Sequence, residues 1–95
     1  MTTPVEPRAI NILLVEDNPA DARLVLEFLR DAGLARLVLT QADRLDQAVE
    51  HIRRGRFDAI ILDLNLPDSS GLETFARAYL EASDAPILVL TGVLD

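Results

Sequence analysis

Short apolar runs alternate with helix-like patterns along this chain, and the alternation limits the folds it can adopt. Residues 10–15, 37–39, 59–62 and 86–91 have the character of strands, and helical spacing follows each of the first three runs. A connection between parallel strands places a helix on the face of the sheet. We therefore predict an α/β fold, and 95 residues make one domain at most.

Apolar residues three or four positions apart define the helices that connect these strands. The first helix follows Asn18-Pro19 and ends at Gly33, and the second ends at Gly55. The third begins after Gly71, which we expect to start the helix without a side chain in the way. The apolar positions are Leu24, Val25, Phe28 and Leu29 in the first helix, Leu45, Ala48, Val49 and Ile52 in the second, and Leu72, Phe75, Ala76 and Tyr79 in the third.

Charge and composition restrict the partners and ligands of the chain. A formal charge of −7 argues against direct binding of nucleic acid or of an anionic membrane, because both would repel this surface. Without cysteine, neither disulfides nor thiolate metal sites can form, so oxygen ligands remain, and a reducing cytoplasm is the expected location. Residues 1–8 have no signal-peptide pattern, and no apolar run reaches membrane-spanning length.

Polar residues stand at the carboxyl ends of three predicted strands, which is where open parallel sheets bind ligands. Glu16 and Asp17 follow the first strand, Asp63 follows the third, and Thr91 and Gly92 follow the fourth. If the first and third strands are neighbours, their three carboxylates converge, and each pair at about 4 Å repels by roughly 4 kcal/mol. Such a cluster needs a hard divalent cation, and Mg²⁺ accepts one or two carboxylates together with water.

These motifs resemble the receiver domains of response regulators in two-component signalling. The similar segments are residues 15–18 after the first strand, residues 62–67 with Gly71, and residues 90–92. The resemblance covers nearly the whole chain. It implies a flavodoxin-like, doubly wound parallel sheet with strand order 2-1-3-4-5, which is the usual order of flavodoxin-like folds.

The resemblance also implies the roles of individual residues. Asp63 would be the phosphoacceptor, attacking a phosphoryl group carried on a kinase histidine. Asp17 and Asp63 would bind Mg²⁺ directly, the backbone carbonyl of Asn65 would supply a third protein ligand, and Glu16 would act mainly through a bound water. Thr91 would contact the phosphoryl group and move as the switch. The neighbouring Gly92 would leave room for its entry.

The sequence departs from the family pattern after the fourth strand. Receivers have a fifth strand–helix unit with a lysine at the phosphoryl site, and this chain contains no lysine. We therefore divide the chain into an N-terminal leader, residues 1–8, and a receiver domain, residues 9–95, that lacks the last helix–strand–helix portion. The apolar fourth strand would then form a sheet edge, and we expect the chain either to self-associate through that edge or to be poorly stable alone.

The expected partners are a sensor histidine kinase or phosphotransfer protein and an effector domain beyond this chain. Beyond accepting a phosphoryl group and hydrolysing its own aspartyl-phosphate, no enzymatic activity is expected. A dehalogenase-type phosphatase would need a second acid where Asn65 stands, and an FMN site would be repelled by Glu16 and Asp17. A receiver that is never phosphorylated and serves only protein contact remains an alternative.

Overall fold

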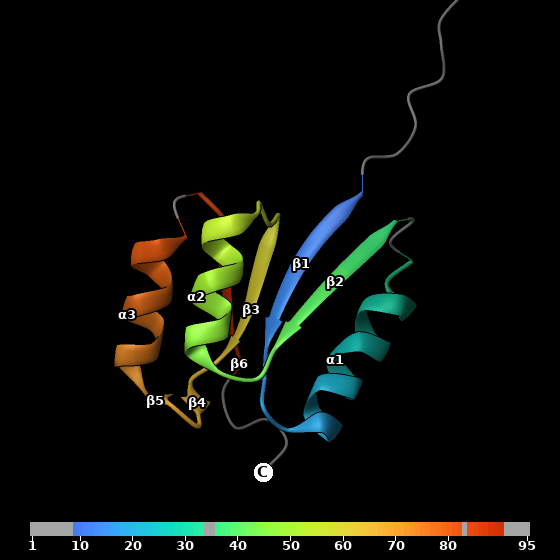
Figure 1. Ribbon diagram of the computed structural model, residues 1–95. Coiled ribbons are helices and arrows are strands. Elements are labelled where there is room, and N and C mark those ends of the chain that lie inside the picture. Colours follow the sequence, from blue (N-terminus) through green and yellow to red (C-terminus); the bar gives the residue numbers. More distant parts are fainter. Residues whose placement is uncertain (1–8, 34–35, 83, 91–95) are drawn as a thin grey trace, which may run out of the picture.

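The computed structural model describes residues 9–33, 36–82 and 84–90 as a sheet flanked by helices (Figure 1). The predicted leader, residues 1–8, and the predicted site residues Thr91 and Gly92 lie outside the described residues. In chain order the elements are β1 (Ile10–Val15), α1 (Pro19–Asp31), β2 (Leu37–Ala42), α2 (Leu45–Arg54), β3 (Ala59–Asp63), β4 (Asn65–Leu66), β5 (Ser69–Ser70), α3 (Leu72–Glu81) and β6 (Ile87–Leu90).

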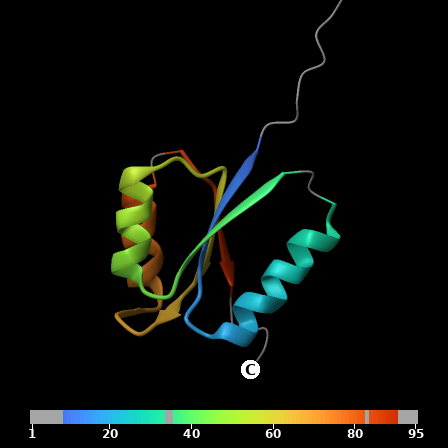
Figure 2. The same cartoon turned by 45° about the vertical axis from the view of Figure 1, so that its right-hand side comes forward.

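The main sheet has the order β2-β1-β3-β6, and every neighbouring pair in it is parallel. Since β6 is the fourth predicted strand, this is the order 2-1-3-4 that the resemblance implied. Helix α1 covers one face of the sheet, and α2 and α3 cover the other (Figure 2). The connections from β1 and β3 therefore part to opposite faces. This is the topological switch point at which such sheets bind ligands.

The core lies on both faces of β1 and β3. Leu13, Leu14 and Val15 are completely buried, as is Leu62 in the neighbouring strand. Because successive side chains of a strand point to opposite faces, Leu13 and Val15 pack toward α2 and α3, whereas Leu14 packs toward α1. Burial of each such side chain contributes about 1.5–3 kcal/mol. The ends of β1 and β3 are thus the most firmly held part of the sheet.

Two elements differ from the sequence prediction. Strand β2 extends to Ala42 rather than ending at Leu39, because all six of its residues pair in register with β1. The expected loop after Asp63 contains a small antiparallel hairpin, β4 with β5, in which Asn65 pairs with Ser70. Both the longer β2 and the hairpin depend on pairing with another segment, which the local residue pattern does not indicate.

The buried faces of the helices agree with the apolar pattern in α2 and differ from it in α1 and α3. Leu45, Ala48 and Val49 are buried in α2, as the spacing predicts. In α1 the apolar Phe28 is 76% exposed, whereas the smaller Ala22 is buried. The buried residues of α3 are Thr74 and Ala78, so its large apolar side chains lie mostly outward.

The outward side of α3 carries an aromatic pair. The rings of Phe75 and Tyr79 stack with their centroids 5.8 Å apart. Leu72 and Tyr79 are 82% and 64% exposed. The orientation of α3 follows from the close packing of small residues against α2, which leaves the larger side chains on the other side. Within the described part of the chain, no helix has both the length and the apolar character needed to cross a membrane.

Candidate metal centre

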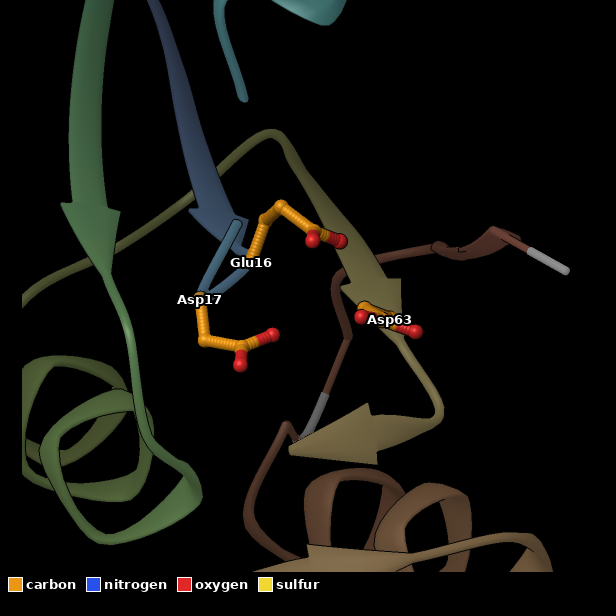
Figure 3. A group of neighbouring side chains, drawn as sticks. All are labelled: Glu16, Asp17 and Asp63. Carbon is orange, nitrogen blue, oxygen red and sulfur yellow. The ribbon is translucent and has the colours of Figure 1, made fainter. Parts of the chain in front are cut away.

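Three carboxylates meet at the carboxyl ends of β1 and β3. Val15 pairs with Leu62, so Glu16 and Asp63 follow at the same edge of the sheet. One oxygen from each of Glu16, Asp17 and Asp63 lies within 4.8 Å of the other two. Figure 3 shows the three side chains around a common space. The convergence predicted for these acids is therefore observed.

The three acids differ in their surroundings. Glu16 is only 8% exposed, Asp63 is half-buried and Asp17 is exposed. The pKa of Glu16 is raised to about 7, mainly by burial and also by its hydrogen bond and charge repulsion with Asp63. The backbone amide of Asn18 donates to Glu16 Oε1 at 3.1 Å and acts in the opposite direction. Glu16 is therefore the carboxyl that most needs a proton or a cation.

The donor set suits a hard divalent cation. At an effective dielectric constant of about 20, charged oxygens this close repel by roughly 3–4 kcal/mol per pair, which a cation would offset. Carboxylate oxygens together with water match the octahedral coordination of Mg²⁺. Asn65 lies next to the cluster, because its amide donates to Asp63 Oδ1 at 3.0 Å. The individual ligand roles of Asp17, Asp63, Asn65 and Glu16 stay predictions.

The segment after Asp63 is held by hydrogen bonds to the carbonyl oxygen of Leu64. The amide of Gly71 donates to this oxygen at 2.8 Å, and the buried hydroxyl of Thr74 lies 3.1 Å from it. Thr74 Oγ1 also lies 2.7 Å from Ser69 Oγ. Because a hydroxyl has one proton, the Ser69 hydroxyl is the donor in one arrangement that satisfies both contacts. These hydrogen bonds join the start of the segment, at Leu64, to its end at Gly71 and to the first turn of α3.

Gly71 has a different role from the one expected. A Cβ built on it would meet no atom within 4 Å, so space does not require glycine here. Its φ of +65° does favour glycine, because residues with a side chain rarely adopt this backbone conformation. The prediction that glycine avoids a steric clash was wrong. Glycine instead permits the turn that leads into α3.

The same segment also contacts the start of α2. Asp68 Oδ1 accepts a hydrogen bond from the amide of Leu45 at 2.8 Å, and Asp68 Oδ2 accepts one from the amide of Asp46 at 3.0 Å. Arg44, the residue at the N-cap position of α2, makes no side-chain capping bond. The carboxylate of Asp68 therefore caps a helix that begins 23 residues earlier in the chain.

Sequence reasoning missed the roles of Asp68 and Thr74. A signal for the first did exist, because a helix that starts after an arginine has backbone amides that need an acceptor from elsewhere. The sequence does not show which of the many acids supplies it. Thr74 was missed because the prediction of α3 relied on its apolar positions, and a polar residue between them is expected to be exposed. Its burial is seen only when the helix is placed on the sheet.

The fold and the acidic cluster define a doubly wound α/β protein with a candidate cation site at its switch point. The response regulator receiver domain family matches residues 12–95. The chain therefore belongs to this family, a receiver domain of two-component signalling.

Among curated proteins, the chain is 34% identical over 92 residues to the transcriptional regulatory protein BaeR of Escherichia coli O6:H1. That match covers 97% of this chain and 37% of BaeR, so the chain spans about a third of the length of that relative.

Two solved structures share the fold and have bound ions. The receiver domain of the sensor histidine kinase PA1611 from Pseudomonas aeruginosa PAO1, with Mg²⁺ coordinated in its active-site cleft, is 34% identical with a TM-score of 0.73. The match covers 90% of this chain and 70% of that chain. A response regulator from Burkholderia pseudomallei with a phosphorylated aspartic acid and a calcium ion is 32% identical with a TM-score of 0.72, over 90% of this chain and 49% of that chain.

Proposed function

We propose that this receiver accepts a phosphoryl group on Asp63, with Mg²⁺ at the same site, and thereby regulates a partner or a linked effector. The observation that carries the proposal is the meeting of Glu16, Asp17 and Asp63 within 4.8 Å at the switch point of the sheet. The relatives with Mg²⁺ in the cleft and with a phosphorylated aspartic acid support it.

The proposed reaction transfers a phosphoryl group between two side chains. A carboxylate oxygen of Asp63 attacks the phosphorus of a phosphohistidine, so an O–P bond forms and the N–P bond breaks. The imidazole nitrogen leaves with the electron pair of the broken bond. Later attack by water on the acyl phosphate restores the carboxylate and releases inorganic phosphate. The half-buried position of Asp63 leaves its carboxylate accessible for this attack.

The surrounding groups orient Asp63 and would hold the cation. The amide of Asn65 donates to one oxygen of Asp63 and so helps to orient this carboxylate. Asp17, Asp63 and the carbonyl of Asn65 would bind Mg²⁺, with Glu16 acting through water. When bound, the metal neutralises charge on the transferring oxygens. Thr91 is proposed as the phosphoryl contact and switch, and Gly92 as the residue that leaves space for it.

Incubation with acetyl phosphate and Mg²⁺, followed by intact mass measurement, tests the function. We expect one phosphoryl adduct, lost in Asp63→Asn and lost when EDTA removes the metal. Asp43→Asn is a matched control, since Asp43 is an exposed acid outside the cluster, and it should keep the adduct. A properly folded chain with no adduct would instead support the alternative of a receiver that acts through protein contact alone.

The proposed partners follow from the family. A sensor histidine kinase or a phosphotransfer protein would supply the phosphoryl group in the cytoplasm, and a linked effector would read the modified state. The length of BaeR beyond the matched region is consistent with such an effector. The charge of −7 argues against nucleic acid or membrane as a direct partner of this chain.

Self-association through β6 is also proposed. This strand is the last of the described sheet on its side, and its Leu88 and Val89 are 59% and 38% exposed. An apolar strand edge pairs readily with another chain. Sedimentation should show a dimer that is weakened by Leu88→Lys, and a concentration-independent monomer would contradict this part of the proposal.

A further inference from the structure

The start of α2 and the segment after Asp63 are joined by one carboxylate. Resting on the proposed function, we infer that Asp68 is a positioning residue for the metal centre. Its side chain ties the hairpin that carries Asn65 to the first turn of α2. Asp68 does not reach the phosphoryl group or the metal in this inference, and it acts through the backbone of the segment on which it stands.

The contacts of Asp68 show how strongly the two segments are tied. Each of its two oxygens accepts a different backbone amide, those of Leu45 and Asp46, at 2.8 and 3.0 Å. These amides have no acceptor in the helix itself, because they belong to its first turn. The N-terminus of a helix also favours a negative charge. The attachment therefore combines two hydrogen bonds with a favourable helix dipole.

The other side of this contact is a rigid anchor. Leu45 is completely buried, and Ala48 and Val49 fix α2 in the core against the sheet. The first turn of α2 therefore cannot move without disturbing the core. Asp68 transfers this rigidity to a segment whose own side chains are mostly exposed.

The hairpin carries the restraint from Asp68 to the acidic cluster. Pro67 and Asp68 form the turn between β4 and β5, and Asn65 pairs with Ser70 at the base. Asn65 also donates to Asp63 Oδ1. The tip of the hairpin is thus held by α2, and its base contacts the proposed phosphoacceptor. Loss of the attachment at the tip leaves the Asn65 carbonyl, a proposed metal ligand, less fixed.

The reason for a positioning role is that bonds outside the ligand shell orient the ligands of a metal. Loss of such a bond commonly weakens metal affinity by about 10–100-fold. Asp68 does not contact Asn65 directly and acts on it through the hairpin. We therefore expect the loss of metal affinity in Asp68→Ala to lie at the lower end of that range. A role in helix capping alone would instead change the stability of α2 without changing the metal site.

A second variant separates these two roles. Arg44 has the extended backbone of an N-cap residue, with φ −144° and ψ 156°. Its guanidinium group has no hydrogen-bond acceptor, so its side chain cannot cap the helix. The substitution Arg44→Ser supplies a local cap for the amide of Asp46, which is one of the two amides that Asp68→Ala leaves open. The double variant Arg44→Ser/Asp68→Ala therefore restores part of the capping of α2 without restoring the contact between α2 and the hairpin.

Glu81→Ala is the matched control. Glu81 is an acid on α3 that accepts two hydrogen bonds from Arg53 of α2, at 2.8 and 3.0 Å, near the other end of both helices. Its removal also breaks a two-bond contact between elements distant in sequence. The contact lies away from the acidic cluster, so it tests whether any such loss affects the metal site.

The experiment measures Mg²⁺ binding by calorimetry, amide hydrogen exchange at Asn65 and Gly71, and the midpoint of urea unfolding in the full chain. For Asp68→Ala we expect a dissociation constant about tenfold higher and faster exchange at Asn65. In the double variant the unfolding midpoint should return toward that of the wild type, while both site measurements stay changed. Glu81→Ala should leave the dissociation constant within about twofold of the wild type.

Recovery of Mg²⁺ affinity in the double variant would overturn the inference, since Asp68 would then act only as a cap. An equal loss of affinity in Glu81→Ala would overturn it as well, by showing a general effect of stability. Wild-type binding of Mg²⁺ that Asp63→Asn does not weaken would overturn the proposed function and, with it, the inference. Unchanged affinity in Asp68→Ala, with normal loss in Asp63→Asn, would overturn the inference alone.

Discussion

Helices α1 and α2 both begin at the edge of the sheet that bears the acidic cluster, but their first turns are capped in different ways. In α1, Asn18 accepts from the amides of Ala20 and Asp21 at 2.9 and 3.3 Å, so the cap is local. In α2 the acceptor is Asp68, from the segment after β3. A local cap fixes one helix, whereas a distant cap also fixes the segment that supplies it.

The largest stability effect should follow removal of the distant cap. Asp68→Ala is expected to lower the free energy of unfolding by about 1–2 kcal/mol, because both a helix cap and a link between segments are lost. Urea titration followed by circular dichroism measures it. A loss smaller than that of Asn18→Ala would show that the distance of the cap adds nothing to stability.

Removal of the local cap should have a smaller effect. Asn18→Ala is expected to cost about 1 kcal/mol, since Pro19 still favours the helical backbone at the first position of α1. The same titration applies. Hydrogen exchange should become faster at Ala20 and Asp21 and stay unchanged at Leu45, because a local cap serves only its own helix.

Acid should distinguish the two caps further. Burial acts to raise the pKa of Asp68, but the hydrogen bonds from Leu45 and Asp46 and the charge of Arg44 together lower it below the ordinary value of 3.8. The stabilisation by this carboxylate is therefore complete above that value and is lost as the pH falls through the lower pKa of the folded state.

The stability gap between the wild type and Asp68→Asn should accordingly be widest above pH 5 and narrow in stronger acid, by less than about 1 kcal/mol for an exposed group. The gap between the wild type and Asn18→Ala should stay constant over the same range, since an amide does not titrate. Unfolding titrations between about pH 2.5 and 6 compare the two gaps. If both stability gaps changed with pH in the same way, the prediction that only the Asp68 cap titrates would be wrong.

The smallest effect is expected for a second cap placed on α2. Arg44→Ser alone should change the free energy of unfolding by no more than about 0.5 kcal/mol, because Asp68 already serves the amides. The substitution also removes an exposed ion pair with Asp46, with a distance of 2.8 Å. A large stabilisation would mean that the distant cap is weakly formed in solution.

The local cap of α1 could be predicted from the sequence, whereas the distant cap of α2 could not. Asn18-Pro19 is a local signal for a helix start, and the apolar run that ends at Glu16 is a strong signal for a buried strand. The position of the acidic cluster follows from these local patterns once β1 and β3 are taken as neighbours. That order came from the resemblance to receivers, and the structure has the same order.

The remaining features depend on contacts between segments distant in sequence. Nothing near Asp68 indicates that its carboxylate caps α2, and no local pattern distinguishes the hairpin from an irregular loop. The burial of Thr74 instead of Leu72 depends on how α3 rotates on the sheet, which packing against α2 decides. Periodicity locates a helix more reliably than it identifies the side that becomes buried.

The aromatic pair on α3 has a consequence for spectroscopy. Tyr79 is the only tyrosine of the chain and there is no tryptophan, so intrinsic ultraviolet emission arises almost wholly from this ring. The ring is stacked on Phe75, is 64% exposed and stands near the C-terminal end of α3, whereas the hairpin after Asp63 leads into the N-terminal end of this helix. Emission should therefore follow the melting of α3, while occupancy of the cation site would pass unseen without an added fluorophore.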